Sequence, residues 1–334
     1  MMLEPERQNV GSSSPPVFIV GCPRSGTTLL RAMLASHPDL AIPPESHFIP
    51  RVWAVRHRYA SEGTFDAERL VDDIARTSRF RDWGLTKRSV LEQVRELKPD
   101  SLAATVEAVF VAYAREQHKP RWGDKTPGYS LDLPLLAGLW PEARFVHIIR
   151  DGRDVALSFL ELGSGARRLL EAAAAWSNRV RKARADGMAL GDERYLEVRY
   201  EDMVADPERV VRAVCRHIRL DFRPQMLDYS TGVDRLIPKS ERHLHRNLAR
   251  PPTKGLRDWR LQMSSTDVQL FEAVAGAELV EFGYERAAPA IAAGPRVRAY
   301  AGLVGNAFTR ASWATRRWAL TKFKAESLPP PRRW

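Results

Sequence analysis

The chain has 334 residues, of which 44% are hydrophobic and 28% charged, and its formal net charge is +11. These fractions are typical of a soluble globular protein and exclude a collagen-like or largely disordered chain. No apolar run approaches the ~18 residues of a membrane-spanning helix. The two cysteines, Cys22 and Cys215, lie far apart and outside any CxxC pair, which excludes a disulfide scaffold and a thiolate zinc site.

The positive charge is unevenly distributed along the chain. From residue 296 onwards there are nine basic residues and one acidic residue, a local charge of +8, which leaves +3 for the rest. A body with this ordinary balance does not indicate a nucleic-acid partner. Residues 1–15 are polar and lack the apolar core of a secretory signal, so we expect a mobile leader and a cytoplasmic location.

The first predicted strand covers residues 17–20 (VFIV), a short β-branched and aromatic run that is typical of a buried strand. Residues 21–28 (GCPRSGTT) follow directly, and large apolar residues recur at helical spacing over residues 29–34. The order is therefore strand, glycine-containing loop and helix.

Two more units of this kind follow later in the chain. Residues 145–149 (FVHII) predict a strand, which leads through 150–154 (RDGRD) into a helix over 155–159. Residues 195–199 (YLEVR) predict a third strand, and a helix is expected at 207–217. Strands that alternate with helices predict an α/β fold, with a P-loop-type parallel sheet flanked by helices.

An inserted helical cap is predicted between the first two units, at about residues 52–119. Apolar spacing indicates helices around 70–74, 90–97 and 102–113, and the connection is too long for a plain crossover. Such an insertion above the strand ends is a usual place for substrate selection. We expect one α/β domain over residues 16–290 that includes this cap.

The glycines at 21 and 26 have the spacing of a P-loop, and Thr27 and Thr28 follow them. Backbone amides of such a turn, with the dipole of the next helix, form a phosphate site; a simple connecting turn is the alternative. A nucleoside-triphosphate P-loop has Lys directly after the second glycine, where this chain has Thr27. The cation is Arg24, inside the loop, which favours a cradle for a single phosphate.

The loop with its flanking residues and three later segments resemble those of a known family. Residues 23–29 (PRSGTTL) resemble the 5′-phosphosulfate loop of sulfotransferases that use 3′-phosphoadenosine 5′-phosphosulfate (PAPS), and residues 19–51 most resemble tyrosylprotein sulfotransferases and their bacterial relatives. Residues 150–158 (RDGRDVALS) are similar to the family's 3′-phosphate signature. Residues 122–127 (WGDKTP) and 199–202 (RYED) also match.

The resemblance, which extends discontinuously from about residue 16 to 284, implies metal-independent transfer of a sulfuryl group from PAPS to an acceptor hydroxyl. The product nucleotide is then adenosine 3′,5′-bisphosphate. The resemblance also implies a role for each matching residue. The 5′-phosphate is assigned to the loop residues Arg24, Ser25, Gly26, Thr27 and Thr28, with Arg24 also stabilising the leaving oxygen. The 3′-phosphate is assigned to Arg150 and Ser158, and Tyr200 is placed near the adenine.

The acceptor hydroxyl requires a base, and the resemblance points to Glu45. Glu45 stands where tyrosylprotein sulfotransferases carry their catalytic glutamate, and Lys125 is expected to be a second cation on the sulfuryl oxygens. An ordinary carboxylate is a weak base, which works best late in the reaction. His47 is the competing base, and the sequence leaves this choice open.

The chain departs from the family pattern in several places. Tyrosylprotein sulfotransferases have a membrane anchor and disulfides, which are not expected here. Leu162 replaces an arginine that those enzymes carry beyond the 3′-phosphate serine. Lys254 and Gly255 loosely resemble the loop that covers the 3′-phosphate in cytosolic members, at a spacing one residue short.

The sequence therefore predicts a PAPS-dependent sulfotransferase whose acceptor is open: a carbohydrate, glycolipid, small alcohol, phenol or tyrosine. The alternatives are a P-loop small-molecule kinase and a non-catalytic nucleotide-binding or membrane-associated protein. Residues 291–334 are expected to be a basic C-terminal extension, with an apolar helical stripe over 300–311. Whether that helix docks on the body, on a second subunit or on an anionic membrane is also open.

Overall fold

The computed structural model describes residues 14–61, 63–162, 169–232 and 257–287, together with Leu328. The predicted leader, apart from its last two residues, lies outside the described residues, as do Lys254, Gly255 and nearly all of the C-terminal extension. Those predictions therefore stay predictions. Within the described ranges, no helix is long and apolar enough to cross a membrane.

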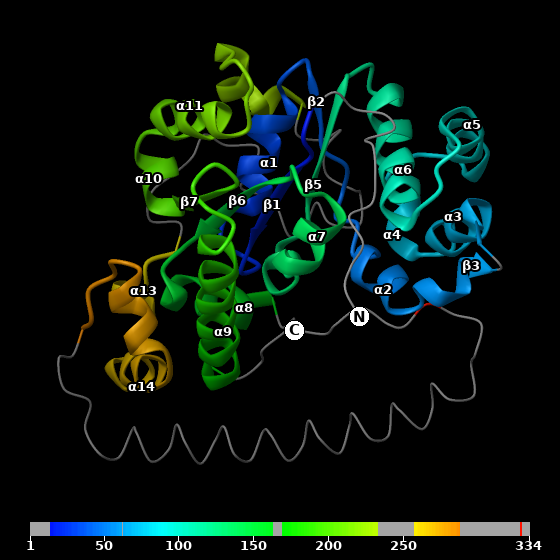
Figure 1. Cartoon of the computed structure of the whole chain (residues 1–334). Coiled ribbons are helices and arrows are strands. Elements are labelled where there is room, and N and C mark those ends of the chain that lie inside the picture. The colour runs from blue at the N-terminus through cyan, green and yellow to red at the C-terminus, as the bar shows by residue number, and fades with distance from the viewer. Residues whose placement is uncertain (1–13, 62, 163–168, 233–256, 288–327, 329–334) are drawn as a thin grey trace.

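A parallel five-stranded sheet lies at the centre of the molecule, in the order β2-β5-β1-β6-β7 (Figure 1). Its strands are β1 (Val17–Gly21), β2 (Leu40–Ala41), β5 (Arg121–Lys125), β6 (Arg144–Ile149) and β7 (Tyr195–Arg199). Every pairing is parallel, so the carboxyl ends of the strands meet at one edge, where ligands bind in α/β sheets. The predicted fold class and all three predicted strands are confirmed.

Helices cover both faces of the sheet. Because successive side chains of a strand point to opposite faces, alternate residues of β1 belong to two different hydrophobic cores. Val17 and Ile19 lie in the core that includes residues of α1, α10 and α11. Phe18 and Val20 lie in the core that includes the cap and α7, and a third core joins the end of β6 to α8, α9 and α14. These helices are α1 (Thr27–Ala35), α7 (Leu133–Leu139), α8 (Gly152–Leu162), α9 (Leu169–Met188), α10 (Tyr200–Ala205), α11 (Pro207–His217) and α14 (Ser265–Glu281).

Strand β5 is not predicted by the sequence pattern, although it matters most for the site. Its residues, RWGDK, include three charged side chains and a glycine, a composition that is unusual for a buried strand. All five are nevertheless buried, because β5 pairs with β1 on one side and β2 on the other. Two of its charged side chains have polar partners: Arg121 donates to the carbonyl oxygens of Ile218 and Arg219, and Lys125 contacts Glu45.

The cap lies beside the sheet (Figure 1) and is formed by the part of the chain that runs from β2 to β5. Its elements are α2 (Ile49–Ala54), η1 (Arg56–Arg58), β3 (Ala60–Ser61), β4 (Thr64–Phe65), α3 (Ala67–Ala75), α4 (Ser78–Arg81), α5 (Lys87–Leu97) and α6 (Leu102–Glu116). The three predicted helices correspond to α3, α5 and α6, each of which begins at a capping side chain: Asp66, Thr86 and Ser101. Phe110 of α6 stacks on Trp122 of β5 with ring centroids 4.5 Å apart, which fixes the cap to the sheet.

Candidate active site

The loop between β1 and α1 has the backbone geometry of an anion site. Gly26 has φ of 96° and precedes α1, and no side chain caps this helix end. The first-turn amides of α1 therefore face the loop, where the helix dipole also favours a negative charge. A Cβ on Gly26 would lie 2.4 Å from the ring of Tyr200, so this position requires glycine for two reasons. The same contact places Tyr200 directly against the loop.

Two segments that are far apart in the sequence meet beside this loop. Arg24 Nε donates to Ser158 Oγ at 3.0 Å, and Arg150 Nη1 lies 3.4 Å from the carbonyl oxygen of Arg24. The Arg150 guanidinium also lies 4.5 Å from the centre of the Tyr200 ring. The structure therefore brings the residues predicted for the two phosphates of the nucleotide into one cluster.

This cluster carries concentrated positive charge. Burial, followed by the neighbouring charges of Arg257 and Arg150, lowers the pKa of Arg24. The sequence pattern does not identify Arg257 as a site residue. Arg257 forms an ion pair with Glu161 at 2.6 Å. Crowded cations of this kind are stabilised when an anion binds among them.

Two buried polar atoms of the cluster have unused hydrogen-bonding capacity. Ser25 Oγ and Arg150 Nε are buried, and neither has a hydrogen-bond partner among the described residues. Buried donors without partners are uncommon in folded proteins, and a ligand is one reason for them. They belong to the loop predicted for the 5′-phosphate and to the signature predicted for the 3′-phosphate, so these residues fit a nucleotide that carries both groups.

A second cluster adjoins the loop on the side of β5. Lys125 Nζ lies 2.7 Å from Glu45 Oε1 and 3.4 Å from Thr28 Oγ1, and His47 Nε2 lies 2.6 Å from Glu45 Oε2. Lys125 is only 2% exposed. The structure thus brings together Glu45, Lys125 and the first turn of α1, and it places His47 on the other oxygen of the same carboxylate.

The protonation of Glu45 follows from these contacts. Burial alone would raise its pKa, but the charge of Lys125 and the hydrogen bond from His47 outweigh burial and lower the pKa. Glu45 is therefore an ionised carboxylate at neutral pH, with cations or donors on both oxygens.

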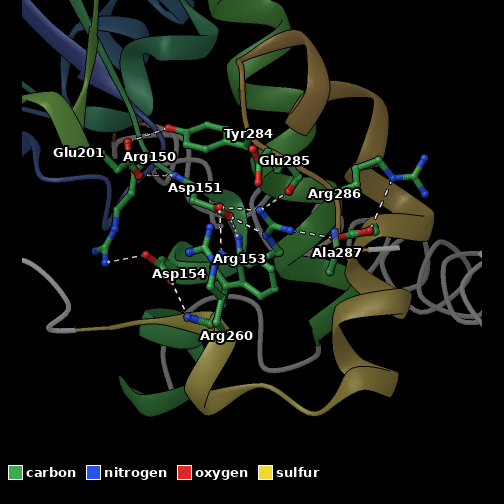
Figure 2. Close-up of polar contacts among 12 residues, drawn as sticks. Arg150, Asp151, Arg153, Asp154, Glu201, Arg260, Tyr284, Glu285, Arg286 and Ala287 are labelled. Carbon is green, nitrogen blue, oxygen red and sulfur yellow. Dashed lines mark hydrogen bonds and ion pairs between the residues drawn. The ribbon is translucent and has the colours of Figure 1, made fainter. Parts of the chain in front are cut away.

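Behind the nucleotide cluster lies a network of buried charges that orients residues 150–154 (Figure 2). Arg153 is fully buried and contacts Asp151 at 2.7 Å and Glu272 of α14 at 2.8 Å. Trp259 packs on the Arg153 guanidinium at 3.6 Å, and its Nε1 donates to Asp151. Arg153 is thus structural, whereas Arg150, three residues earlier, faces the cluster with Arg24.

Comparison with known proteins agrees with this geometry. The model of the sulfotransferase family matches residues 15–224. Protein-tyrosine sulfotransferase 1 of Danio rerio is 25% identical over 81% of this chain and 72% of its own length. Protein-tyrosine sulfotransferase 2 of Gallus gallus is 26% identical over 64% of this chain, and this chain spans only 54% of its length.

Solved structures give the same result. The sulfotransferase domain of the Synechococcus PCC 7002 olefin synthase is 27% identical, with a TM-score of 0.57, and covers 85% of this chain and 99% of that one. The sulfotransferase domain from the curacin biosynthetic pathway has the same fold, with a TM-score of 0.58. It is 21% identical, and the match covers 82% of this chain and 99% of that one. Since the family model matches well over half of its residues, the chain belongs to the sulfotransferase family.

Proposed function

We propose that this protein transfers the sulfuryl group of PAPS to the hydroxyl of an acceptor, with Glu45 as the base. One observation carries the proposal: Lys125 contacts both Glu45 and Thr28, which lies in the first turn of α1 directly after the phosphate loop. A single buried cation therefore joins the base to the loop that would hold the leaving group. Sulfuryl transfer in line between acceptor and nucleotide requires this adjacency.

The proposed roles of residues in nucleotide binding are supported by the two buried donors without partners among the described residues, Ser25 Oγ and Arg150 Nε, and by the cluster of cations around Arg24. PAPS, when bound, supplies an activated sulfuryl group whose leaving group is the 5′-phosphate. The amides of the loop and Ser25 would bind that phosphate, while Arg150 and Ser158 would bind the 3′-phosphate. Tyr200, which packs on Gly26 and against Arg150, would border the adenine.

The transfer step is assigned to the second cluster. Glu45, ionised at neutral pH, would accept the acceptor's proton late, as bond formation to sulfur makes the hydroxyl more acidic. Lys125 and Arg24 would neutralise charge on the sulfuryl and bridging oxygens; loss of one such group typically costs about 3–4 kcal/mol of transition-state stabilisation. His47 would hold the second oxygen of Glu45 in place.

We infer that the acceptor is a phenolic hydroxyl, with a tyrosine side chain as the first candidate. The support is the set of relatives, several of which are named protein-tyrosine sulfotransferases. A kinase acting through the same loop is disfavoured by Thr27, since a P-loop kinase uses lysine at that position.

Radiolabelled PAPS tests the proposal directly. The purified chain is incubated with a tyrosine-containing peptide, with the same peptide carrying phenylalanine, and with simple sugars and alcohols. We expect label only in the tyrosine peptide. Label in a sugar would overturn the phenol, and transfer of phosphate from ATP with none of sulfate from PAPS would overturn the whole proposal.

A further inference from the structure

A buried hydroxyl network lies directly beside Glu45, on the side of its chain neighbour Ser46. The Ser46 amide donates to Thr126 Oγ1 at 3.0 Å, and Ser46 Oγ lies 2.7 Å from Tyr129 Oη. The same Tyr129 oxygen accepts from the amide of Ile49 at 3.1 Å. Two side chains thus bind the backbone of the Glu45 segment at two points, one and four residues beyond the carboxylate.

Both side chains come from the segment that also carries Lys125. Thr126 follows Lys125 at the end of β5, and Tyr129 lies in η2 (Pro127–Leu131). Thr126, Tyr129 and Ser46 are at most 3% exposed. Hydrogen bonds in such a dry, closed network hold their geometry tightly. One short segment therefore fixes both the position of Glu45 and the cation that contacts it.

The other side of the Glu45 segment is held from the phosphate-loop helix. Arg31 of α1 is 2% exposed, and its Nε and Nη2 donate to the carbonyl oxygen of Ile42 at 3.0 and 2.9 Å. Ile42 precedes Glu45 by three residues. The segment between Ile42 and Ile49 is thus bound to the first helix on one side and to β5 and η2 on the other.

We propose that Thr126 and Tyr129 are positioning residues for the Glu45 carboxylate. Neither is placed to contact the reacting atoms; each acts by fixing the backbone of residues 46–49, and through it the distance from Glu45 to Lys125. The inference rests on the proposed function and adds the residues on which the placement of its base depends. A misplacement of about 1 Å at such a site can lower turnover by about 100-fold.

The test measures kcat and KM of the full chain for Thr126→Val, Thr126→Ser and Tyr129→Phe. Ser130→Ala is the matched control: Ser130 is buried in the same η2 turn, and its Oγ has no partner among the described residues. We expect kcat to fall about 10- to 100-fold in Thr126→Val and Tyr129→Phe, with KM for PAPS within about twofold of wild type. Thr126→Ser, which keeps the acceptor oxygen, should recover most of the rate, and Ser130→Ala should match wild type.

Three results would overturn the proposal. Wild-type kcat in both Thr126→Val and Tyr129→Phe would overturn it, as would equal losses in Thr126→Val and Thr126→Ser, because the hydroxyl would then be irrelevant. If Thr126→Val does not fold, the kcat of Tyr129→Phe decides between the outcomes. A crystal structure of Tyr129→Phe with Glu45 still about 2.7 Å from Lys125 would also overturn it, and this readout needs no activity. Absence of PAPS turnover in wild type would instead reject the proposed function.

Discussion

Asp124, which precedes Lys125 in β5, is a buried carboxylate. Its charge lowers the free energy of unfolding at neutral pH. Burial raises its pKa from the usual 3.8 to about 6, and the neighbouring hydroxyl groups of Ser46 and Thr126 offset only part of this effect. Neither carboxylate oxygen has a hydrogen-bond partner among the described residues. Between pH 3.8 and 6 the folded chain therefore binds more protons at this site than the unfolded chain. The site's contribution to the free energy of unfolding falls by about 3 kcal/mol as the pH rises through that window.

We therefore predict that Asp124→Asn raises Tm at pH 7.5 and that its advantage over wild type shrinks as the pH falls towards 4. Thermal unfolding at several pH values measures this difference. Asp192→Asn, at an exposed position, is the control and should show no pH-dependent gap. A constant gap for Asp124→Asn would contradict the raised pKa.

Glu45 allows a test of the base at the level of one atom. Glu45→Gln keeps the size of the side chain and removes its charge, so we expect kcat to fall by about 10²–10⁴-fold. Because Lys125 and His47 lower the pKa of Glu45, the base stays ionised and should cause no loss of rate between pH 8 and 6. His47→Asn should retain far more activity than Glu45→Gln. Near-normal kcat in Glu45→Gln, with loss in His47→Asn, would move the base to His47.

A comparison of alanine substitutions at Gly26, in the phosphate loop, and at Gly84, in the cap, separates the effect of backbone strain from the effect of steric crowding. Both have positive φ, 96° and 73°, so alanine at either should destabilise the fold by about 1 kcal/mol or more. Only at Gly26 would the new Cβ meet another group, the Tyr200 ring at 2.4 Å; nothing lies within 4 Å at Gly84. We predict that Gly26→Ala also abolishes binding of adenosine 3′,5′-bisphosphate, measured calorimetrically, whereas Gly84→Ala binds normally.

At the scale of elements, α8 and α14 are joined through one buried cation. Arg153 of α8 binds Asp151 (Figure 2). It also binds Glu272, whose side chain is fully buried. Removal of the cation leaves Asp151 with no cation in contact in the part of the chain that the structure describes, and it leaves Glu272 to the more distant Arg286, at 3.5 Å. Arg153→Met should therefore destabilise the chain by about 3 kcal/mol in urea unfolding. Arg88→Ala, which breaks the exposed pair with Glu92, should change little. Equal effects would show that the Arg153 network is not important for stability.

The strands that the sequence predicts are those with several large apolar or β-branched residues in one short run. The run at 17–20 is wholly apolar, and the runs at 145–149 and 195–199 are so at most or alternate positions; they are the strands β1, β6 and β7. The run at 121–125 is charged, and only its position between two other strands buries it. No local pattern carries that information, because sheet pairing is a tertiary property.

At the scale of the whole molecule, local sequence patterns likewise predict only part of the site. The phosphate loop is predictable because its glycines, hydroxyls and flanking elements are contiguous. The meeting of Glu45 with Lys125 is not, because it depends on the parallel pairing that sets Lys125 opposite Ile19 of β1. Resemblance to the family named both residues, but only the fold shows that His47 shares the Glu45 carboxylate and that Arg257 adds charge beside Arg24.

The whole chain should report nucleotide binding through its stability, since the two signatures come from separate elements that one ligand would link. A ligand at 100 times its Kd adds about 2.7 kcal/mol to the free energy of unfolding. We expect adenosine 3′,5′-bisphosphate to raise Tm, adenosine 5′-monophosphate to raise it less, and magnesium-ATP to leave it unchanged. Arg150→Ala should remove the difference between the first two nucleotides, because Arg150 faces the proposed 3′-phosphate. A larger shift with magnesium-ATP would favour the kinase, and an undiminished difference in Arg150→Ala would show that the 3′-phosphate binds elsewhere.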